Sequence, residues 1–134
     1  MKKDWLRIQA HIIFGFLLIE YLLGMGASLF VQFPDTTNER ILWEFAKGQW
    51  SIVLHMIIAL GLLISGIVFL IRTIRRKNKY WIISASIGLA SLLVATFAGM
   101  EFISTQNDAA SYTMATAFLI ALVSYGWGIY KGRK

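Results

Sequence analysis

The sequence predicts an all-α polytopic membrane protein: four transmembrane helices in an up-down-up-down bundle, with a short interfacial helix in the first outer loop. The chain of 134 residues is 57% hydrophobic and only 15% charged, which is too apolar for an ordinary soluble domain. Residues 50–71 contain no titratable group except His55. At about 1.5 Å per residue this stretch can cross a hydrocarbon core of about 30 Å. Residues 1–134 are therefore expected to form a single membrane domain.

The first transmembrane helix is predicted over residues 8–33. Pro34 stops it, since proline disfavours helical geometry in the residue before it. The polar connection that follows contains a short segment, residues 39–47, whose Ile41, Leu42 and Phe45 fall on one helical face with Trp43 beside them. This pattern predicts a short helix that lies in the headgroup region.

The other three transmembrane helices are predicted over residues 50–72, 80–103 and 110–130. The second ends in the basic run RTIRRKNK, and the fourth is closed by KGRK. A short polar loop over residues 104–108 joins the third and fourth. Aromatic residues mark most of the boundaries, as in the interfacial belts of membrane proteins.

The positive charges predict the orientation in a cell membrane. Eleven Lys and Arg residues lie at the two termini and in the loop between the second and third helices, against two, Arg40 and Lys47, on the other side. By the positive-inside rule, both termini are cytoplasmic. Because topology explains the net charge of +6, we expect no nucleic-acid partner. The chain has no cysteine, which excludes disulfides and thiolate metal sites.

His55 is the main candidate for cofactor or metal binding. It lies about 7 Å below the outer boundary of its helix. An imidazole in a membrane helix is costly unless it faces the bundle interior and has a partner. A neutral imidazole can also ligate iron or copper. The alternative is a histidine hydrogen-bonded to a neighbouring helix or to headgroup water.

Residues near the same depth are candidates to act with His55. Met100, Met114 and Glu101 lie near the same outer level, and Met25 lies somewhat deeper. A His/Met pair is a known haem ligation and also suits copper, although methionine is a routine gap-filler in apolar cores. His11 lies near the cytoplasmic start of the first helix, so it is expected to be interfacial and not part of this site.

Glu20 lies near the middle of the first helix, where a carboxyl group is expensive. Residues of this kind serve proton relays and cation transport, and Glu101 is a second relay candidate. The structural alternative is a neutral glutamic acid hydrogen-bonded to a hydroxyl such as that of Ser65 or Ser91.

The pattern resembles one four-helix half of the heme A synthase family. The resembling segments, in order, are GMGASLFVQFP (residues 24–34), LHMIIALGLLISG (54–66), RTIRRKNK (72–79) and ATFAGMEF (95–102). They correspond to a glycine-rich outer end of the first helix, a histidine near the outer start of the second, a basic inner loop and the outer end of the third. The resemblance implies a four-helix bundle with His55 as an axial ligand of haem.

The departures from that family change the implied activity. The fourth helix has no histidine and offers Met114 or Thr116, the outer loop lacks the family's cysteine pair, and Ile52 stands where the family has a glutamate three residues before the histidine. Oxidation of a haem methyl group is therefore not expected. A single haem b with His55 as one ligand, or a bundle without a cofactor, fits the departures.

Three classes of function remain open. The first is a b-type haem-binding protein for electron transfer, haem sensing or haem handling, which uses His55 with Met114 or Met100. The second is a small proton- or cation-coupled transporter, expected to be a homo-oligomer, which uses Glu20. The third is a non-catalytic accessory subunit of a membrane complex. Enzymatic turnover is least favoured, because no acid, base and nucleophile converge at one depth.

Overall fold

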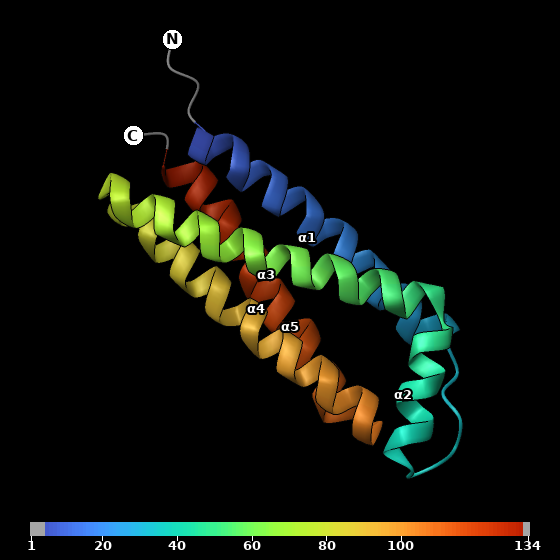
Figure 1. Ribbon diagram of the computed structural model, residues 1–134. Helices are drawn as coiled ribbons and strands as arrows, with labels where there is room; N and C mark the ends of the chain where they lie inside the picture. Colours follow the sequence, from blue (N-terminus) through green and yellow to red (C-terminus); the bar gives the residue numbers. More distant parts are fainter. Residues whose placement is uncertain (1–4, 133–134) are drawn as a thin grey trace.

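The computed structural model describes residues 5–132, and every regular element in that range is an α-helix. The helices are α1 (Trp5–Phe30), α2 (Glu39–Gly48), α3 (Trp50–Arg76), α4 (Lys79–Thr105) and α5 (Asp108–Lys131) (Figure 1). All except α2 are long and apolar enough to cross a membrane. The prediction of an all-α chain with four such helices is confirmed.

Asparagine side chains determine where three of the helices begin. Oδ1 of Asn78 accepts the backbone N–H of Tyr80 at 3.1 Å, and Asn38 and Asn107 cap α2 and α5 in the same way. These caps satisfy N–H groups that the first helical turn leaves without a partner. As a result, α4 and α5 begin one and two residues before the predicted starts at residues 80 and 110.

The helices α3 and α4 also extend past their predicted ends at residues 72 and 103. Each ends at a residue in the left-handed backbone region, Lys77 with φ 55° and Gln106 with φ 54°. The last turn of α3 keeps its helical form with Arg75 and Arg76 in it, since cations interact favourably with the C-terminal end of the helix dipole.

The helix predicted over residues 8–33 is found at Trp5–Phe30, so its end was placed three residues too late. Pro34 restricts only the residue before it, but Phe33 has other contacts that a helix would break. Its ring lies 5.3 Å from that of Phe45 and 5.8 Å from that of Phe102, between ring centroids. The chain has thus left the helix axis before the proline, where Phe33 packs in this aromatic cluster.

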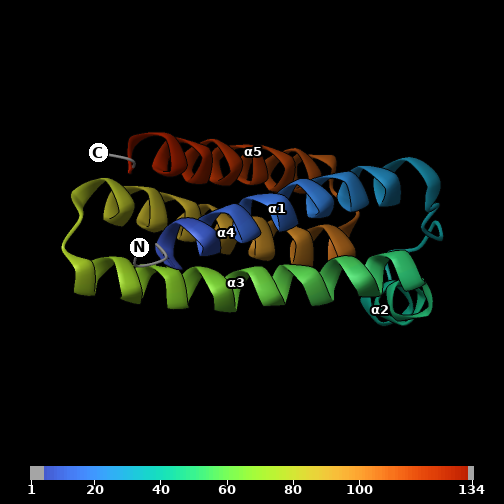
Figure 2. The same ribbon diagram turned by 90° about the horizontal axis from the view of Figure 1, so that it is seen from above.

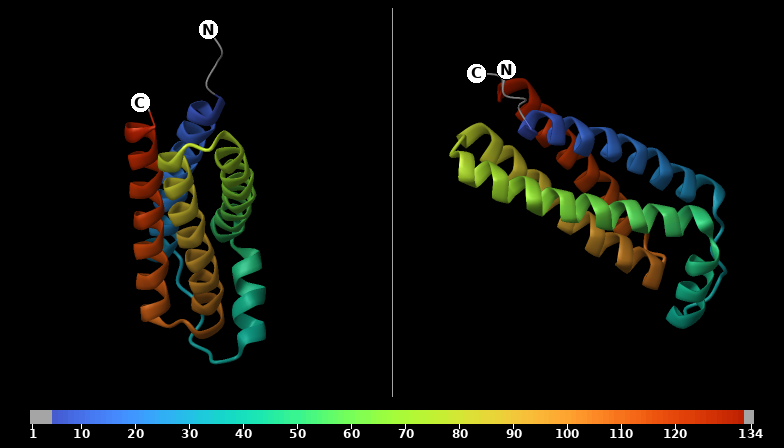
Figure 3. Two further views of the ribbon diagram at one scale, coloured as in Figure 1. Left: turned by 90° about the vertical axis from the view of Figure 1, so that its left-hand side faces the viewer. Right: turned by 45° about the horizontal axis from the view of Figure 1, so that its top comes forward.

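The four long helices form a closed ring. Both α1 and α4 pack against α3 and α5, so α1 and α4 occupy opposite corners (Figure 2). The start of α1, the end of α5 and the α3–α4 turn lie at one end of the bundle, whereas α2 and the α4–α5 connection lie at the other (Figure 3).

Small residues bring α4 and α5 into the closest contact of the ring. Oγ of Ser84 donates a hydrogen bond to the backbone carbonyl of Ser124 at 2.7 Å. The ring of Tyr125 lies directly against the backbone of α4 at Gly88, where a Cβ would overlap it. Close backbone approach over small residues is the usual way that helices associate in membranes.

The outward faces of the bundle are apolar. In the apolar 18-residue stretch of each helix, only 17% of the residues of α1 and 22% of those of α3 are buried inside the protein. Soluble monomers rarely leave continuous apolar surface of this extent in water. The lengths and the outward faces are those of membrane-spanning helices.

Helix α2 packs across the ends of α3 and α4. Its buried residues are Leu42 and Ala46, whereas Ile41 is exposed, so the inward face is turned slightly from the predicted one. Nε1 of Trp43 donates to Oγ of Ser104 at 3.1 Å, which ties α2 to the end of α4. The segment predicted to be helical at residues 39–47 is thus a helix fixed to the bundle.

Candidate functional site

The two ionisable residues that the sequence places inside α1 and α3 lie together. Nδ1 of His55 is 3.1 Å from Oε1 of Glu20. The Glu20 side chain is 0% exposed and that of His55 is 16% exposed. Both carboxyl oxygens and Nδ1 are buried without a hydrogen bond of regular geometry in the described part of the chain. The Glu20 carboxyl group and the His55 imidazole are therefore each other's polar neighbour. In these surroundings an unpaired polar group is costly.

Gly24 provides the space for the imidazole ring. It follows Glu20 by four residues, so the two share one face of α1. A Cβ built at Gly24 would lie 3.2 Å from Cε1 of His55, and the other ring atoms within 4 Å of it are the two nitrogens. The face of α1 that includes Glu20 and Gly24 thus fixes both the position and the orientation of the ring.

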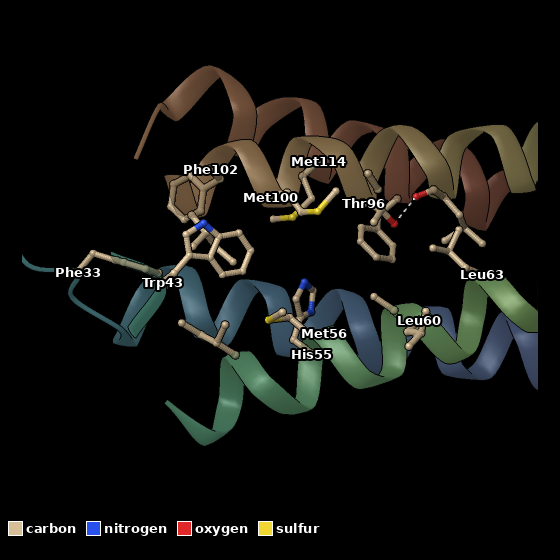
Figure 4. Close-up of a pocket in the computed structure, with 17 residues that line it drawn as sticks. Phe33, Trp43, His55, Met56, Leu60, Leu63, Thr96, Met100, Phe102 and Met114 are labelled. Carbon is tan, nitrogen blue, oxygen red and sulfur yellow. Dashed lines mark hydrogen bonds between the residues drawn. The ribbon is translucent and has the colours of Figure 1, made fainter. Parts of the chain in front are cut away.

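The imidazole also borders a cavity of about 210 Å³ between α3 and α4 (Figure 4). His55 is the only residue of its lining with a titratable side chain. Oγ1 of Thr96, which also lines it, donates to the backbone carbonyl of Leu92 at 2.9 Å. The cavity is therefore apolar apart from the ring of His55.

Two thioethers face His55 across this cavity. Met100 on α4 and Met114 on α5 both line the cavity, and the ring nitrogen of His55 farther from its backbone points towards their side of it (Figure 4). Gly99 makes room for Met114, since a Cβ there would lie 3.3 Å from the sulfur. Met56 lines the cavity beside His55 on α3. An imidazole nitrogen and soft sulfur atoms thus meet in one apolar space.

The cavity has an opening on the side of the bundle. Met56, Leu60 and Met100 line it and are nevertheless 38%, 59% and 41% exposed. These side chains belong to the outward faces of α3 and α4, which are the faces that lipid would contact. The cavity is therefore accessible from the surroundings of the helices between α3 and α4.

A second hollow, of about 350 Å³, lies between the end of α1 and the start of α5. Four polar residues line it, together with Gly24 and Met114: Ser28, Asp35, Gln106 and Ser111. Met114 borders both hollows, and Gly24 contacts the His55 ring. The hollow at the end of the bundle thus reaches Gly24 and Met114, which lie beside the surroundings of His55.

Three residues considered with the site lie elsewhere. Glu101 is exposed and does not line the cavity, although its neighbour Met100 does. Met25 is also exposed and outside the lining. His11 is exposed, with Nδ1 2.6 Å from the backbone oxygen of Arg7, and lies nine residues before Glu20 on α1, or about 13 Å along the helix.

The alternative in which a hydroxyl such as that of Ser65 or Ser91 is hydrogen-bonded to Glu20 is not found, because neither carboxyl oxygen has a hydrogen-bond partner among the described residues. Oγ of Ser91 donates to the carbonyl of Ile87 in its own helix at 2.9 Å, and the ion-pair partner of Glu20 is His55. The sequence reasoning missed this pair because it ended the first helix at residue 33. The true end at Phe30 brings Glu20 about 4.5 Å nearer to the C-terminal end of its helix. The sequence feature that could have indicated the pair is Gly24, because a glycine on the same helix face as Glu20 leaves room for a side chain from a neighbouring helix.

The side chains around the cavity that could ligate a metal are the imidazole of His55 and the thioethers of Met56, Met100 and Met114. No group of three or more His, Cys, Asp or Glu side chains able to hold a metal ion occurs among residues 5–132. An ion bound directly would have one imidazole and thioethers. In haem the porphyrin supplies the equatorial ligands, so the protein needs to provide only axial ones.

Comparison of the chain with protein-family models, with curated proteins and with solved structures gave no match.

Proposed function

We propose that the protein is a small integral membrane protein in which α1, α3, α4 and α5 cross the cell membrane up-down-up-down. Both termini are cytoplasmic, and α2 lies in the outer headgroup region. The charge distribution supports this, since Arg72, Arg75, Arg76 and Lys131 lie at one end of the bundle and positive charge is retained on the cytoplasmic side. Other charges counted for this orientation, at residues 2, 3, 133 and 134, lie outside the described residues.

Within this bundle, we infer a b-type haem site in which His55 is one axial ligand. A single observation supports it most: an imidazole held at Nδ1 by Glu20, with its other nitrogen directed across an apolar cavity towards the side lined by Met100 and Met114. Histidines that ligate metals usually donate their second ring N–H to a carboxylate, a backbone carbonyl or a water, which fixes their orientation. Glu20 is suited to this positioning role.

The residues of the cavity fit a haem better than a polar ligand. The walls are apolar, and aromatic and thioether groups make up much of them. At about 210 Å³ the cavity is smaller than ligand sites of about 300–1,000 Å³, so a bound group would extend through the opening between α3 and α4. A haem bound there supplies a one-electron redox centre. Electron transfer, haem sensing and haem handling are the functions that such a centre serves.

Absorbance spectroscopy tests this proposal directly. We expect the detergent-purified protein, as isolated or after addition of haem, to show a Soret band that His55→Ala abolishes. His11→Ala is the matched control, because His11 is exposed and hydrogen-bonded to its own helix, and it should leave the band unchanged. Absence of the band from the unaltered protein supplied with haem would overturn the proposal.

A second function is favoured by the hollow that leads in from the outer end. The buried carboxyl of Glu20 is paired with an imidazole, and a hollow lined by Asp35 reaches Gly24, one turn from Glu20 on α1. These are features of a proton or cation relay. A transporter of this kind would show proton or cation flux in liposomes that Glu20→Gln abolishes. Glu101→Gln, at an exposed carboxyl, is the control. A protein with neither a Soret band nor flux would instead be an accessory subunit, identified by the membrane partner that co-purifies with it.

A further inference from the structure

The hollow between the end of α1 and the start of α5 is a ligand site in its own right, distinct from the cavity beside His55. Its volume of about 350 Å³ is in the range of small-molecule sites, about 300–1,000 Å³. The lining comes from the last two turns of α1 with the connection that follows, the end of α4 and the first two turns of α5. These segments lie at the end of the bundle opposite to Trp5 and Gly132, where the described range begins and ends (Figure 3).

The carboxylate and the amide of this lining are available as hydrogen-bond acceptors. The Asp35 carboxylate takes part in no hydrogen bond or ion pair among the described residues. Nε2 of Gln106 donates to the backbone carbonyls of Phe102 and Ile103 at 3.1 and 3.2 Å. This use of both N–H groups leaves the amide oxygen for a ligand. A ligand that suits these two groups is a hydrogen-bond donor.

Two serine hydroxyls of the lining are also free to accept. The hydroxyls of Ser91, Thr96 and Thr113 donate to the backbone carbonyl four residues earlier in their own helices. No such bond is made by Ser28 or Ser111 within the part of the chain that the structure describes. Their oxygens can therefore face the donors of a ligand.

The charge around the hollow favours a cation. The lining contains no Lys, Arg or His. At this end of the bundle the described cations are Arg40, which pairs with Glu44 at 3.2 Å, and Lys47. The described carboxyl groups there are those of Asp35, Glu39, Glu44, Glu101 and Asp108. A surface of this sign attracts positively charged ligands.

The rest of the lining is apolar and partly aromatic, which indicates the kind of cation. It includes Ala27, Val31, Phe33, Pro34 and Phe102. The rings of Phe33 and Phe102 lie 5.8 Å apart between centroids in an edge-to-face arrangement. Aromatic rings attract ammonium groups that lie within about 6 Å of the ring centroid. A metal ion would use none of these groups, and no cluster of three or more His, Cys, Asp or Glu that could hold one occurs in residues 5–132.

We propose that this hollow binds the ammonium group of an organic cation. Asp35 is its counter-ion, the oxygens of Ser28, Ser111 and Gln106 accept from its donors, and the apolar side chains contact its alkyl substituents. A free amine and the ethanolamine or choline headgroup of a lipid share this chemistry. The proposal does not depend on haem at His55 or on transport.

Titration with benzyltrimethylammonium tests the proposal. Binding to the full-length protein, purified in an uncharged detergent, is measured by isothermal titration calorimetry. We expect saturable binding of this cation and none of benzyl alcohol, which keeps the ring without the charge. Asp35→Asn should weaken the binding about tenfold, and Glu101→Gln by less than about twofold. Glu101→Gln is the matched control, because it removes a carboxyl group from the same end of the protein but outside the lining.

A second pair of variants tests the space and keeps the charge. Ser28→Phe places a large side chain in the hollow and should weaken binding about tenfold. Leu29→Phe is its control, since Leu29 is 70% exposed and outside the lining. Far-UV circular dichroism and monodisperse elution confirm that each variant is folded before it is compared.

Three results would overturn the proposal. Absence of saturable binding to the unaltered protein would remove the site, and equal binding of the two probes would mean that the charge is not recognised. Equal losses in Asp35→Asn and Glu101→Gln would mean that the attraction to this end is diffuse. Titration in nanodiscs distinguishes the source of the ligand. Weaker binding in phosphatidylcholine than in an uncharged galactolipid would identify a lipid headgroup as the occupant, and equal binding would identify a free amine.

Discussion

Nδ1 of His55 lies 3.1 Å from Oε1 of Glu20, and this contact joins α1 to α3 inside the bundle. The two residues are 35 positions apart, and each would be unfavourable alone in an apolar environment. Together they convert two buried polar groups into one interaction that orients a ring towards a cavity.

Removal of the Glu20 carboxyl should destabilise the protein by leaving His55 without its partner. We expect Glu20→Ala to lower the free energy of unfolding by about 1–3 kcal/mol, the usual cost of an unsatisfied buried polar group. Glu20→Gln retains an acceptor for Nδ1 and should lower the free energy of unfolding by less. Thermal unfolding in detergent measures both. A Glu20→Ala variant as stable as Glu20→Gln would show that the contact contributes no stability.

A methyl group at Gly24 should displace the imidazole. The added Cβ would lie 3.2 Å from Cε1 of His55, and overpacking of this kind costs about 1–3 kcal/mol. We therefore expect Gly24→Ala to lower Tm and to weaken the Soret band of the haem-loaded protein. Gly26→Ala is the control, since nothing lies within 4 Å of a Cβ there and alanine favours the helix by up to about 1 kcal/mol. Equal Tm values and Soret bands in the two variants would show that Gly24 does not position the His55 ring.

Replacement of Tyr125 by phenylalanine should leave the protein equally stable or make it more stable. The Tyr125 side chain is fully buried between α3 and α4, and its hydroxyl has no hydrogen-bond partner among the described residues. Loss of a buried unsatisfied hydroxyl removes a desolvation cost of about 1–3 kcal/mol, while the ring that packs on Gly88 is kept. Thermal unfolding of Tyr125→Phe checks this. A clear fall in Tm would indicate that the hydroxyl has a partner, such as a bound water.

The orientation can be tested with single cysteines, because the natural chain has none. Thr37→Cys lies in the connection before α2, and Lys79→Cys lies at the start of α4. If the termini are cytoplasmic, a membrane-impermeant maleimide should label Thr37→Cys in intact cells and Lys79→Cys only after permeabilisation. The opposite pattern would reverse the orientation, and labelling of both in intact cells would contradict the membrane placement.

The fold class was predictable because it depends on properties that a single stretch of sequence carries. Length and hydropathy identify the four long helices without knowledge of their neighbours, and the pattern around Leu42 identifies α2. The exact helix ends depend on details such as the αL residues Lys77 and Gln106. The early end of α1 depends on aromatic contacts between Phe33 and segments distant in sequence, which periodicity does not reveal.

The candidate site was predictable only in part. Depth along the helices indicated that His55, Met100 and Met114 lie at one level, and the structure places all three around one cavity. Depth does not indicate the direction in which a side chain points, so Glu101 was grouped with them although it faces outward. The pairing of Glu20 with His55 depends on the lateral register of α1 against α3, which is a property of packing and not of either helix.

The distribution of the site over the ring of helices has a mechanical consequence. Glu20 and His55 belong to α1 and α3, whereas Met100 and Met114 belong to α4 and α5, which are joined closely through Ser84, Gly88 and Tyr125. The cavity lies at the seam between these two halves. A small outward movement of α4 and α5 as one body would therefore increase the separation of the imidazole from the sulfur atoms and leave the contact between Glu20 and His55 intact.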